Sequence, residues 1–342
     1  MKPTGRPYLI VAILLLFALA LSVAVGSVFI PFPTLANLLL SRLRGLPDSK
    51  ELATFGVIVF SLRIPRTILI ALAGAGLSGS GAAYQGLFRN PLADPYLIGV
   101  AAGAGLGAIL AMNSGLTGTT LFGLLGVPAA AFIGALLTVI IVYQLARVGH
   151  TLPTTNLILA GVAVSSFASA LTSFMMLTST GELRRAIVFL LGGATMSGWQ
   201  PVVAMAPYIL VGLGVLLNTG HALNVFQFGE EQAAQMGLPV GRLRRVVVIA
   251  ASLTTAAAVS FAGVIGFIGL IVPHLVRFLW GGDYRRILPL SVFLGAAVLL
   301  FADVLARVVM APQELPVGII TALAGAPFFL WVLRHARQQA FW

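Results

Sequence analysis

Long apolar runs recur along the whole chain, separated by short polar connections. A transmembrane helix needs about 20 apolar residues to cross a hydrocarbon core of roughly 30 Å, because its backbone N–H and C=O groups must all be satisfied within the segment. Ten stretches meet this requirement: 8–30, 66–87, 93–112, 121–146, 154–178, 200–218, 244–262, 264–280, 287–306 and 316–334. The pattern predicts an all-α polytopic membrane protein with about ten transmembrane helices, forming a single transmembrane domain over 1–342.

The first stretch follows Lys2 and Arg6, so a cleaved signal peptide is the alternative interpretation. Its apolar run from Tyr8 to Ile30 is longer than the 7–15 residues of a signal-peptide core. We therefore expect a retained first helix.

Composition supports the membrane assignment. Hydrophobic residues make up 59% of the 342 positions and charged residues 8%, with 20 basic and 9 acidic side chains. A soluble chain of this length would carry about 86 charges at the usual 25% or so. This excludes a soluble enzyme with a membrane anchor. The absence of cysteine excludes disulfides, thiolate nucleophiles and cysteine-ligated metals.

The net charge of +11 is scattered between apolar runs, without the basic stripe of a nucleic-acid-binding protein. We therefore predict no nucleic-acid partner and assign the charge to topology. With a cytoplasmic N-terminus, twelve of the 20 basic residues fall at cytoplasmic ends and eight outside. This margin favours cytoplasmic N- and C-termini.

Small residues recur at every fourth position in two spans, a spacing that lets helix backbones approach closely in lipid. Prolines add breaks: Pro273 is expected to kink its span, and Pro91 and Pro95 to interrupt the chain between the second and third spans. The two stripes are Gly74, Ser78, Ala82, Gly86 and Gly99, Gly103, Gly107, Ala111.

Catalytic and cofactor chemistry finds little support. A phosphate-binding P-loop needs Gly-Lys-Ser/Thr, but Lys50 precedes Glu51, so no such nucleotide site is expected. The four histidines show no metal-ligand spacing. We expect no cofactor or metal bound by this chain, and no enzyme activity of its own.

Two alternative functions remain, an intramembrane protease and an ion-coupled transporter. The tetrapeptide 76–79 has the Gly-x-Ser-Gly form of rhomboid-type intramembrane serine proteases, with Ser78 as nucleophile and His274 as a distant base. A secondary, ion-coupled transporter would need a buried ionisable group, for which Asp303 is the best candidate. Arg307 lies four residues later, however, so a helix would pair the two charges near the outer boundary.

Four stretches together resemble the permease subunits of binding-protein-dependent ABC importers for vitamin B12, ferric siderophores and haem, the FecCD-type family. Their order and spacing extend the resemblance over nearly the whole chain. They are Arg63-Ile64-Pro65-Arg66; the run from Gly74 through Gln85 to 89–95; 266–274; and 314–318 with 325–327. The resemblance implies a type II ABC importer permease fold in the inner (plasma) membrane.

In that family two permease copies form the pathway, two ATPase subunits bind the cytoplasmic face with ATP and Mg, and a periplasmic or lipoprotein binding protein delivers substrate. The resemblance places binding-protein docking on Arg63, Arg66 and Arg307, where a guanidinium fork suits a partner's carboxylates. The alternative is that these arginines anchor helix ends at lipid headgroups.

The segment 219–243 is implied to hold the cytoplasmic coupling helices that contact the ATPase. Within it, 229–239 reads as a short helix with acids at its start, a glycine at its C-terminal cap and a proline beyond. The alternative, a helix on the lipid surface, is disfavoured because acids are repelled by anionic lipid. The coupling residues are Glu230, Glu231, Ala233, Ala234, Gly237, Leu238 and Pro239.

The stretch 182–193 is too short to cross the membrane and resembles the family's outer gate helix, next to the fifth span. We expect Met175, Met176, Arg184 and Arg185 to lie along the pathway or its gate. The expected mechanism is alternating access driven by the ATPase pair. The sequence leaves the substrate open among siderophore, haem, cobalamin and oxyanion.

Overall fold

All regular structure in the described part of the chain is helical. The computed structural model describes residues 5–26, 30–44, 50–114, 121–149, 152–178, 181–193 and 197–336. Ten apolar helices match the ten predicted spans, which confirms an all-α membrane fold. They are α1 (Arg6–Ala24), α4 (Ile64–Phe88), α5 (Val100–Asn113), α6 (Leu121–Ala146), α7 (Thr154–Thr178), α9 (Trp199–Leu217), α12 (Val240–Ala262), α13 (Ile268–Trp280), α14 (Tyr284–Val308) and α15 (Val317–Ala336).

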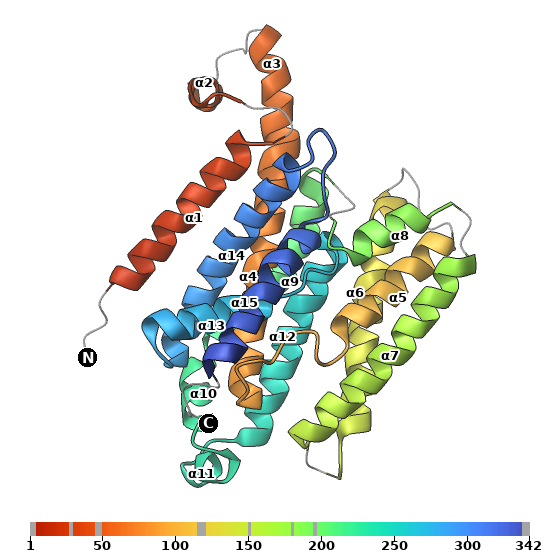
Figure 1. Cartoon of the computed structure of the whole chain (residues 1–342), viewed down its shortest axis with the longest axis vertical. Helices are drawn as coiled ribbons and strands as arrows, with labels where there is room; N and C mark the ends of the chain where they lie inside the picture. The colour runs from red at the N-terminus through yellow and green to blue at the C-terminus, as the bar shows by residue number, and fades with distance from the viewer. Residues whose placement is uncertain are drawn as a thin grey trace.

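Shorter helices mark the two ends of the bundle (Figure 1). One end carries α2 (Phe32–Arg44), α3 (Lys50–Val57) and α8 (Leu183–Leu190), and we call it the α3 end. The other carries α10 (Gly220–Phe226) and α11 (Glu230–Gln235), and we call it the α11 end. Helix α1 rises toward the α3 end, and α15 runs down toward the α11 end.

The second span begins earlier than predicted. Helix continues from α3 through a π-helical segment, η1 (Ile58–Arg63), into α4, so that a single apolar helix covers Thr54–Phe88. The arginines around Pro65 lower the local hydropathy and hid this extension. A proline ring clashes with the carbonyl four residues earlier, and a wider π turn relieves such clashes. In a π-helical turn the Phe60 carbonyl would accept from the N–H of residue 65, which proline lacks. The Trp199 indole N–H donates to the Phe60 carbonyl instead, at 3.0 Å.

Two of the ten helices are too short to cross alone. At 1.5 Å per residue, α5 and α13 measure about 20 Å, and each follows a non-helical stretch, 89–99 or 263–267. Non-helical backbone is tolerated at membrane depth only when protein covers it. The two stretches cover one another: the Tyr96 hydroxyl donates to the Ile265 carbonyl at 2.8 Å and accepts from the Ile265 N–H at 3.1 Å. The break predicted from Pro91 and Pro95 is confirmed.

Helix α4 lies at the centre of the bundle, packed against α12, α13 and α14. The small-residue stripe predicted on it makes these contacts close. A Cβ added at Gly74 would lie 2.4 Å from the Gly295 carbonyl oxygen of α14. The stripe on α5 acts in the same way against α6, where a Cβ at Gly107 would lie 2.1 Å from the Ala130 oxygen. Both stripes are therefore packing surfaces, as predicted.

Candidate functional site

A cluster of charges at the α3 end centres on Asp303, which is completely buried in α14. Arg307 Nε lies 3.0 Å from Asp303 Oδ2, which confirms the predicted pair, and the same Nε donates to the Asp303 backbone carbonyl at 3.3 Å. Arg66, from α4, donates from Nε and Nη2 to Asp303 Oδ1 at 3.1 and 2.9 Å. A buried carboxylate needs such partners to offset its lost hydration.

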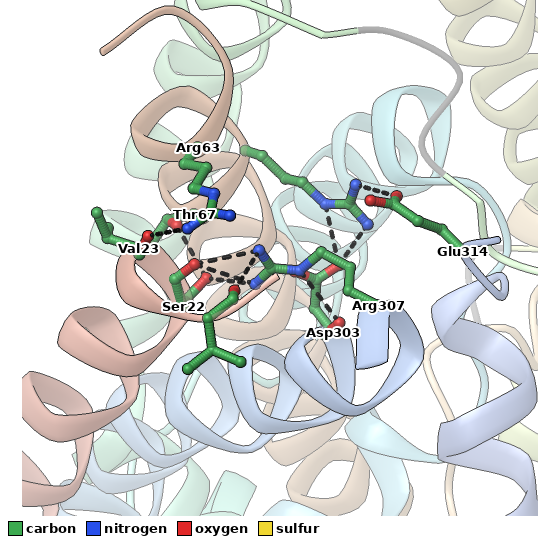
Figure 2. A network of polar contacts seen from close by, with 9 residues as sticks. Ser22, Val23, Arg63, Thr67, Asp303, Arg307 and Glu314 are labelled. Atoms are coloured by element: carbon green, nitrogen blue, oxygen red, sulfur yellow. Dashed lines mark hydrogen bonds and ion pairs between the residues drawn. The ribbon is translucent and has the colours of Figure 1, made fainter. Parts of the chain in front are cut away.

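The same cluster holds the C-terminal end of α1 (Figure 2). Arg63 Nη1 donates to the Val23 and Ala24 carbonyls at 2.9 and 2.8 Å. Arg307 donates to the Ser22 carbonyl from Nη1 and Nη2, both at 3.1 Å, and to the Val25 carbonyl at 3.0 Å. The last carbonyls of a helix have no partner within the helix and carry its negative dipole end, so guanidinium groups suit them. Two arginines therefore cap α1.

This placement changes the reading of the predicted docking arginines. Arg63 and Arg307 are only 7% and 3% exposed, with guanidinium groups turned inward to α1. In this arrangement they act as a scaffold. Arg66 is different: its side chain is 28% exposed, and its Nη1 reaches Glu314 in the connection before α15. Docking of a partner stays a prediction, and Arg66 is the arginine placed to make it. The sequence did not reveal the scaffold role, because α1 and α14 are far apart along the chain.

Helix α8 confirms the short helix predicted at 182–193 and also lies at the α3 end. Phe189 is fully buried, and its carbonyl accepts from the Val264 N–H at 3.1 Å, so α8 rests on the break before α13. Arg184 is exposed, and Arg185 lies 3.8 Å from Glu182. A movement of the break would therefore move α8.

The predicted pathway methionines lie at the last turn of α7. Met175 and Met176 are half-buried, and the Met175 carbonyl accepts from Asn113 Nδ2 of α5 at 3.1 Å. Their role in a pathway or gate stays a prediction.

At the opposite end, α11 has the predicted form. Gly229 precedes it, and Gly237 takes φ +84 with its N–H donating to the Ala234 carbonyl at 2.9 Å. The Leu238 N–H donates to the Ala233 carbonyl at 3.0 Å, which completes a glycine-capped helix end. The helix exposes Glu231 and Ala234, together with Gly237 and Pro239 after it; Leu238 is half-buried.

Two of the predicted coupling residues serve the chain itself. Ala233 is fully buried beneath α11, so its side chain is unavailable to a partner. That assignment is corrected: of the four residues 232–235 only this one turns inward, and helix phase alone did not fix which face packs. Glu230 is exposed but forms an ion pair with the buried Arg244 of α12 at 2.8 Å, which fastens α11 to the bundle.

Helix α10 is tied to the bundle through the loop before α14. Asn224 Nδ2 donates to Asp283 Oδ1 at 2.6 Å, and Asn224 Oδ1 accepts from the Tyr284 N–H at 2.7 Å. The Arg285 guanidinium, hydrogen-bonded to Asp283, together with Asn224 holds the pKa of that carboxyl well below its usual range. Gln227 Nε2 donates to the Gly86 carbonyl of α4 at 3.0 Å. The surface at the α11 end is thus joined to the central helix.

Comparison with known proteins agrees with this geometry. The model of the FecCD transport family matches residues 14–335. The chain belongs to the FecCD transport family. It is 45% identical over 321 residues to the cobalamin import system permease protein BtuC of Halobacterium salinarum, covering 93% of this chain and 84% of that one. It is 35% identical to the Fe(3+)-citrate import system permease protein YfmE of Bacillus subtilis, covering 97% and 96%.

Two further comparisons, with a hemin transport permease and with a solved structure, agree with this family. The hemin transport system permease protein HmuU of Yersinia pestis is 38% identical over 282 residues, covering 82% of this chain and 84% of that one. A metal-chelate type ABC transporter solved in an inward-facing conformation superposes with a TM-score of 0.84 at 28% identity, covering 97% of this chain and all of that one. The chain is a multi-pass membrane permease of the ABC importer class.

FecCD membership leaves the two alternative functions without support, and the geometry agrees. Ser78 donates to the Ile268 carbonyl at 3.5 Å and lies where a Cβ at Gly295 would stand 2.0 Å from its Oγ, so it belongs to the α4–α14 packing surface. Asp303 was the candidate coupling residue for a secondary carrier. Each of its carboxylate oxygens is paired with a guanidinium, so its charge is already neutralised within the chain.

Proposed function

We propose that this chain is the permease subunit of an importer for an iron chelate or cobalamin, working as a homodimer with two ATPase subunits and a substrate-binding protein. The observation that carries the proposal is the contrast between the two ends of the bundle (Figure 1). The α11 end presents a short acid-headed helix fixed to the bundle, and the α3 end presents Arg66 with the amphipathic α8.

The α11 end suits an ATPase partner. Glu231 and Ala234 are exposed on α11, whereas Glu230 and the α10 contacts anchor the surface to α12, α14 and α4. A helix anchored in this way transmits a push to the bundle as a rigid unit instead of bending locally. ATP and Mg would be held by the ATPase, and this chain contributes the surface that is pushed.

The α3 end suits a binding protein outside the cell. The Arg66 guanidinium is bonded to Asp303 and to the exposed Glu314, and a partner's carboxylate would take the place of Glu314. Long-range attraction between such charges speeds association. Helix α8 lies at this end against the break before α13, where a change in the bundle would shift it and open or close the outer pathway. The α11 end then faces the cytoplasm, with both termini on that side.

Reconstitution tests the proposal. The full chain is placed in liposomes with its ATPase and its binding protein, and uptake of cobalamin, haem and ferric citrate is measured with and without ATP. We expect uptake of one of them to require all three components and ATP. Uptake that persists without the ATPase and follows an ion gradient would refute the proposal in favour of a secondary carrier.

A charge reversal at each end separates the two surfaces. Glu231→Lys on α11 should weaken ATPase binding while leaving binding-protein affinity unchanged, because Glu231 is exposed at the α11 end only. Glu182→Lys, just before α8 at the α3 end, is the matched control and should leave ATPase binding unchanged. Since the chain has no cysteine, Gln232→Cys and Arg184→Cys also report which end faces the cytoplasm by labelling with a membrane-impermeant thiol reagent.

A further inference from the structure

A basic cavity opens at the α11 end between α6 and the first turns of α12. It has a volume of about 440 Å³ and is lined by Tyr143, Arg147, Arg244, Arg245 and Glu230, among others. Three arginines against one glutamate give the lining a formal charge of +2. Since Glu230 is engaged by Arg244 at 2.8 Å, the positive charge of the other two arginines is not offset within the lining.

The cavity continues into an apolar groove that runs along α6 and α12 toward the middle of their lengths. This second hollow, about 370 Å³, shares Tyr143, Arg147 and Arg245 with the first, and is otherwise lined mainly by apolar side chains of both helices, such as Ile140 and Ile249. Those two isoleucines are 50% and 66% exposed, so the groove is open along the outer surface of this chain. A charged chamber and an apolar groove thus share one wall.

The depth of each part matches a lipid leaflet. Arg244 lies in the second turn of α12, and Val248, which lines the groove, lies one turn further, about 6 Å along the axis. Arg147 directly follows the last residue of α6. The arginines are therefore at headgroup level and the groove at the level where acyl chains begin. Tyr143, with an apolar ring and a polar hydroxyl, stands at the boundary between them.

We propose that this cavity binds an anionic phospholipid, with its phosphate between Arg147 and Arg245 and an acyl chain along the groove between α6 and α12. Both arginines use Nε for a local backbone carbonyl, Gly149 at 2.8 Å and Gly241 at 3.3 Å, which holds each side chain in place. The terminal nitrogens are the atoms that grip a phosphate. Basic pockets between transmembrane helices on the cytoplasmic side recognise lipid headgroups in this way.

The position gives the lipid a consequence for coupling. Glu230, at the start of α11, lines the same cavity and pairs with Arg244, so a phosphate held between Arg147 and Arg245 lies in the same cavity as the contact that fastens α11. The phosphate would repel Glu230 and compete with it for Arg244, so bound lipid would loosen the attachment of α11. This consequence rests on the proposed function of α11, whereas lipid binding itself does not.

Native mass spectrometry of the detergent-purified full chain tests the site. Dioleoyl phosphatidylglycerol should remain bound where dioleoyl phosphatidylcholine dissociates. Each cytoplasmic arginine near an anionic lipid contributes a free energy worth about fivefold in affinity. We therefore expect Arg147→Gln and Arg245→Gln each to weaken phosphatidylglycerol binding about fivefold, and the double variant by about 25-fold. Arg242→Gln, an exposed neighbour outside the cavity lining, is the matched control and should change it less than twofold.

A soluble headgroup separates the lipid from a free phosphate. Glycerophosphoglycerol carries the phosphate without acyl chains, and it should fail to compete at concentrations where the lipid saturates. Equal retention of phosphatidylcholine, equal losses in the cavity and control variants, or full competition by the headgroup would each overturn the proposal. None of these measurements involves transport, so their outcome stands apart from the test of the importer.

Discussion

Replacing Arg307 with methionine removes the guanidinium that joins α14 to the end of α1 while keeping much of its length. The substitution leaves the Ser22 and Val25 carbonyls without this donor and takes one of two guanidinium partners from Asp303. Each of the two carbonyls left without this donor costs about 1 kcal/mol, and the lost partner of Asp303 about 1 kcal/mol more, because Arg66 still pairs with it. The total is about 3 kcal/mol.

Thermal unfolding of the detergent-purified chain measures this loss, with tryptophan fluorescence as the signal. An unfolding entropy of about 2.1 cal/mol/K per residue over the 342 residues gives roughly 0.7 kcal/mol/K. A loss of about 3 kcal/mol then lowers Tm by about 4 °C. Arg184→Met, at an exposed position on α8, is the control and should lower Tm by less than about 1 °C.

Labelling of a single cysteine shows where the loss acts. Ala24→Cys places a thiol at a fully buried position of α1, next to the caps of Arg63 and Arg307. We expect it to be protected in the parent chain and labelled several-fold faster with Arg307→Met, because the end of α1 loosens. An unchanged Tm together with unchanged labelling would refute the assignment of Arg307 as a cap of α1.

Other predictions concern packing, the loop before α14 and docking. Gly74→Ala should sharply lower the yield of folded protein, because its Cβ would lie 2.4 Å from a backbone oxygen, whereas Gly214→Ala, with nothing within 4 Å, should be tolerated. Asp283→Asn should lower Tm at pH 7, and the difference in Tm from the parent chain should shrink as pH falls below about 4. The reason is that the pKa of Asp283 is lowered in the folded chain, so its carboxylate stabilises the fold above the ordinary aspartate pKa and loses this effect on acidification. Arg66→Gln should weaken binding-protein affinity about tenfold and flatten its salt dependence, while Glu314→Gln should strengthen it by relieving competition for Arg66; equal effects of the two would contradict a docking role.

The sequence predicted most of the fold because lipid imposes strict rules on helix length. The ten apolar stretches matched ten helices, and the stripes around Gly74 and Gly107 were found from spacing alone. The start of the second span was missed, because Pro65 and its flanking arginines resemble the end of an apolar segment. A π-helical turn that accommodates proline leaves no signal in hydropathy.

The candidate sites were predicted less completely. The pair of Asp303 and Arg307 follows from helix spacing and was found, whereas the bond of Arg66 to Asp303 joins residues 237 positions apart and has no local signal. The glycine cap of α11 is local and was found. The inward turn of Ala233 depends on how α11 packs, which a helix of six residues does not encode.

The caps on α1 also set an order of events during synthesis. Arg63 is made about 40 residues after the carbonyls it holds, whereas Arg307 follows Ser22 by 285 residues. At roughly 5–20 residues per second, the second cap arrives about 15–60 s after the first helix has left the ribosome. Until then α1 is held at one side only, so a chain that stops before α14 keeps a loosely held first helix.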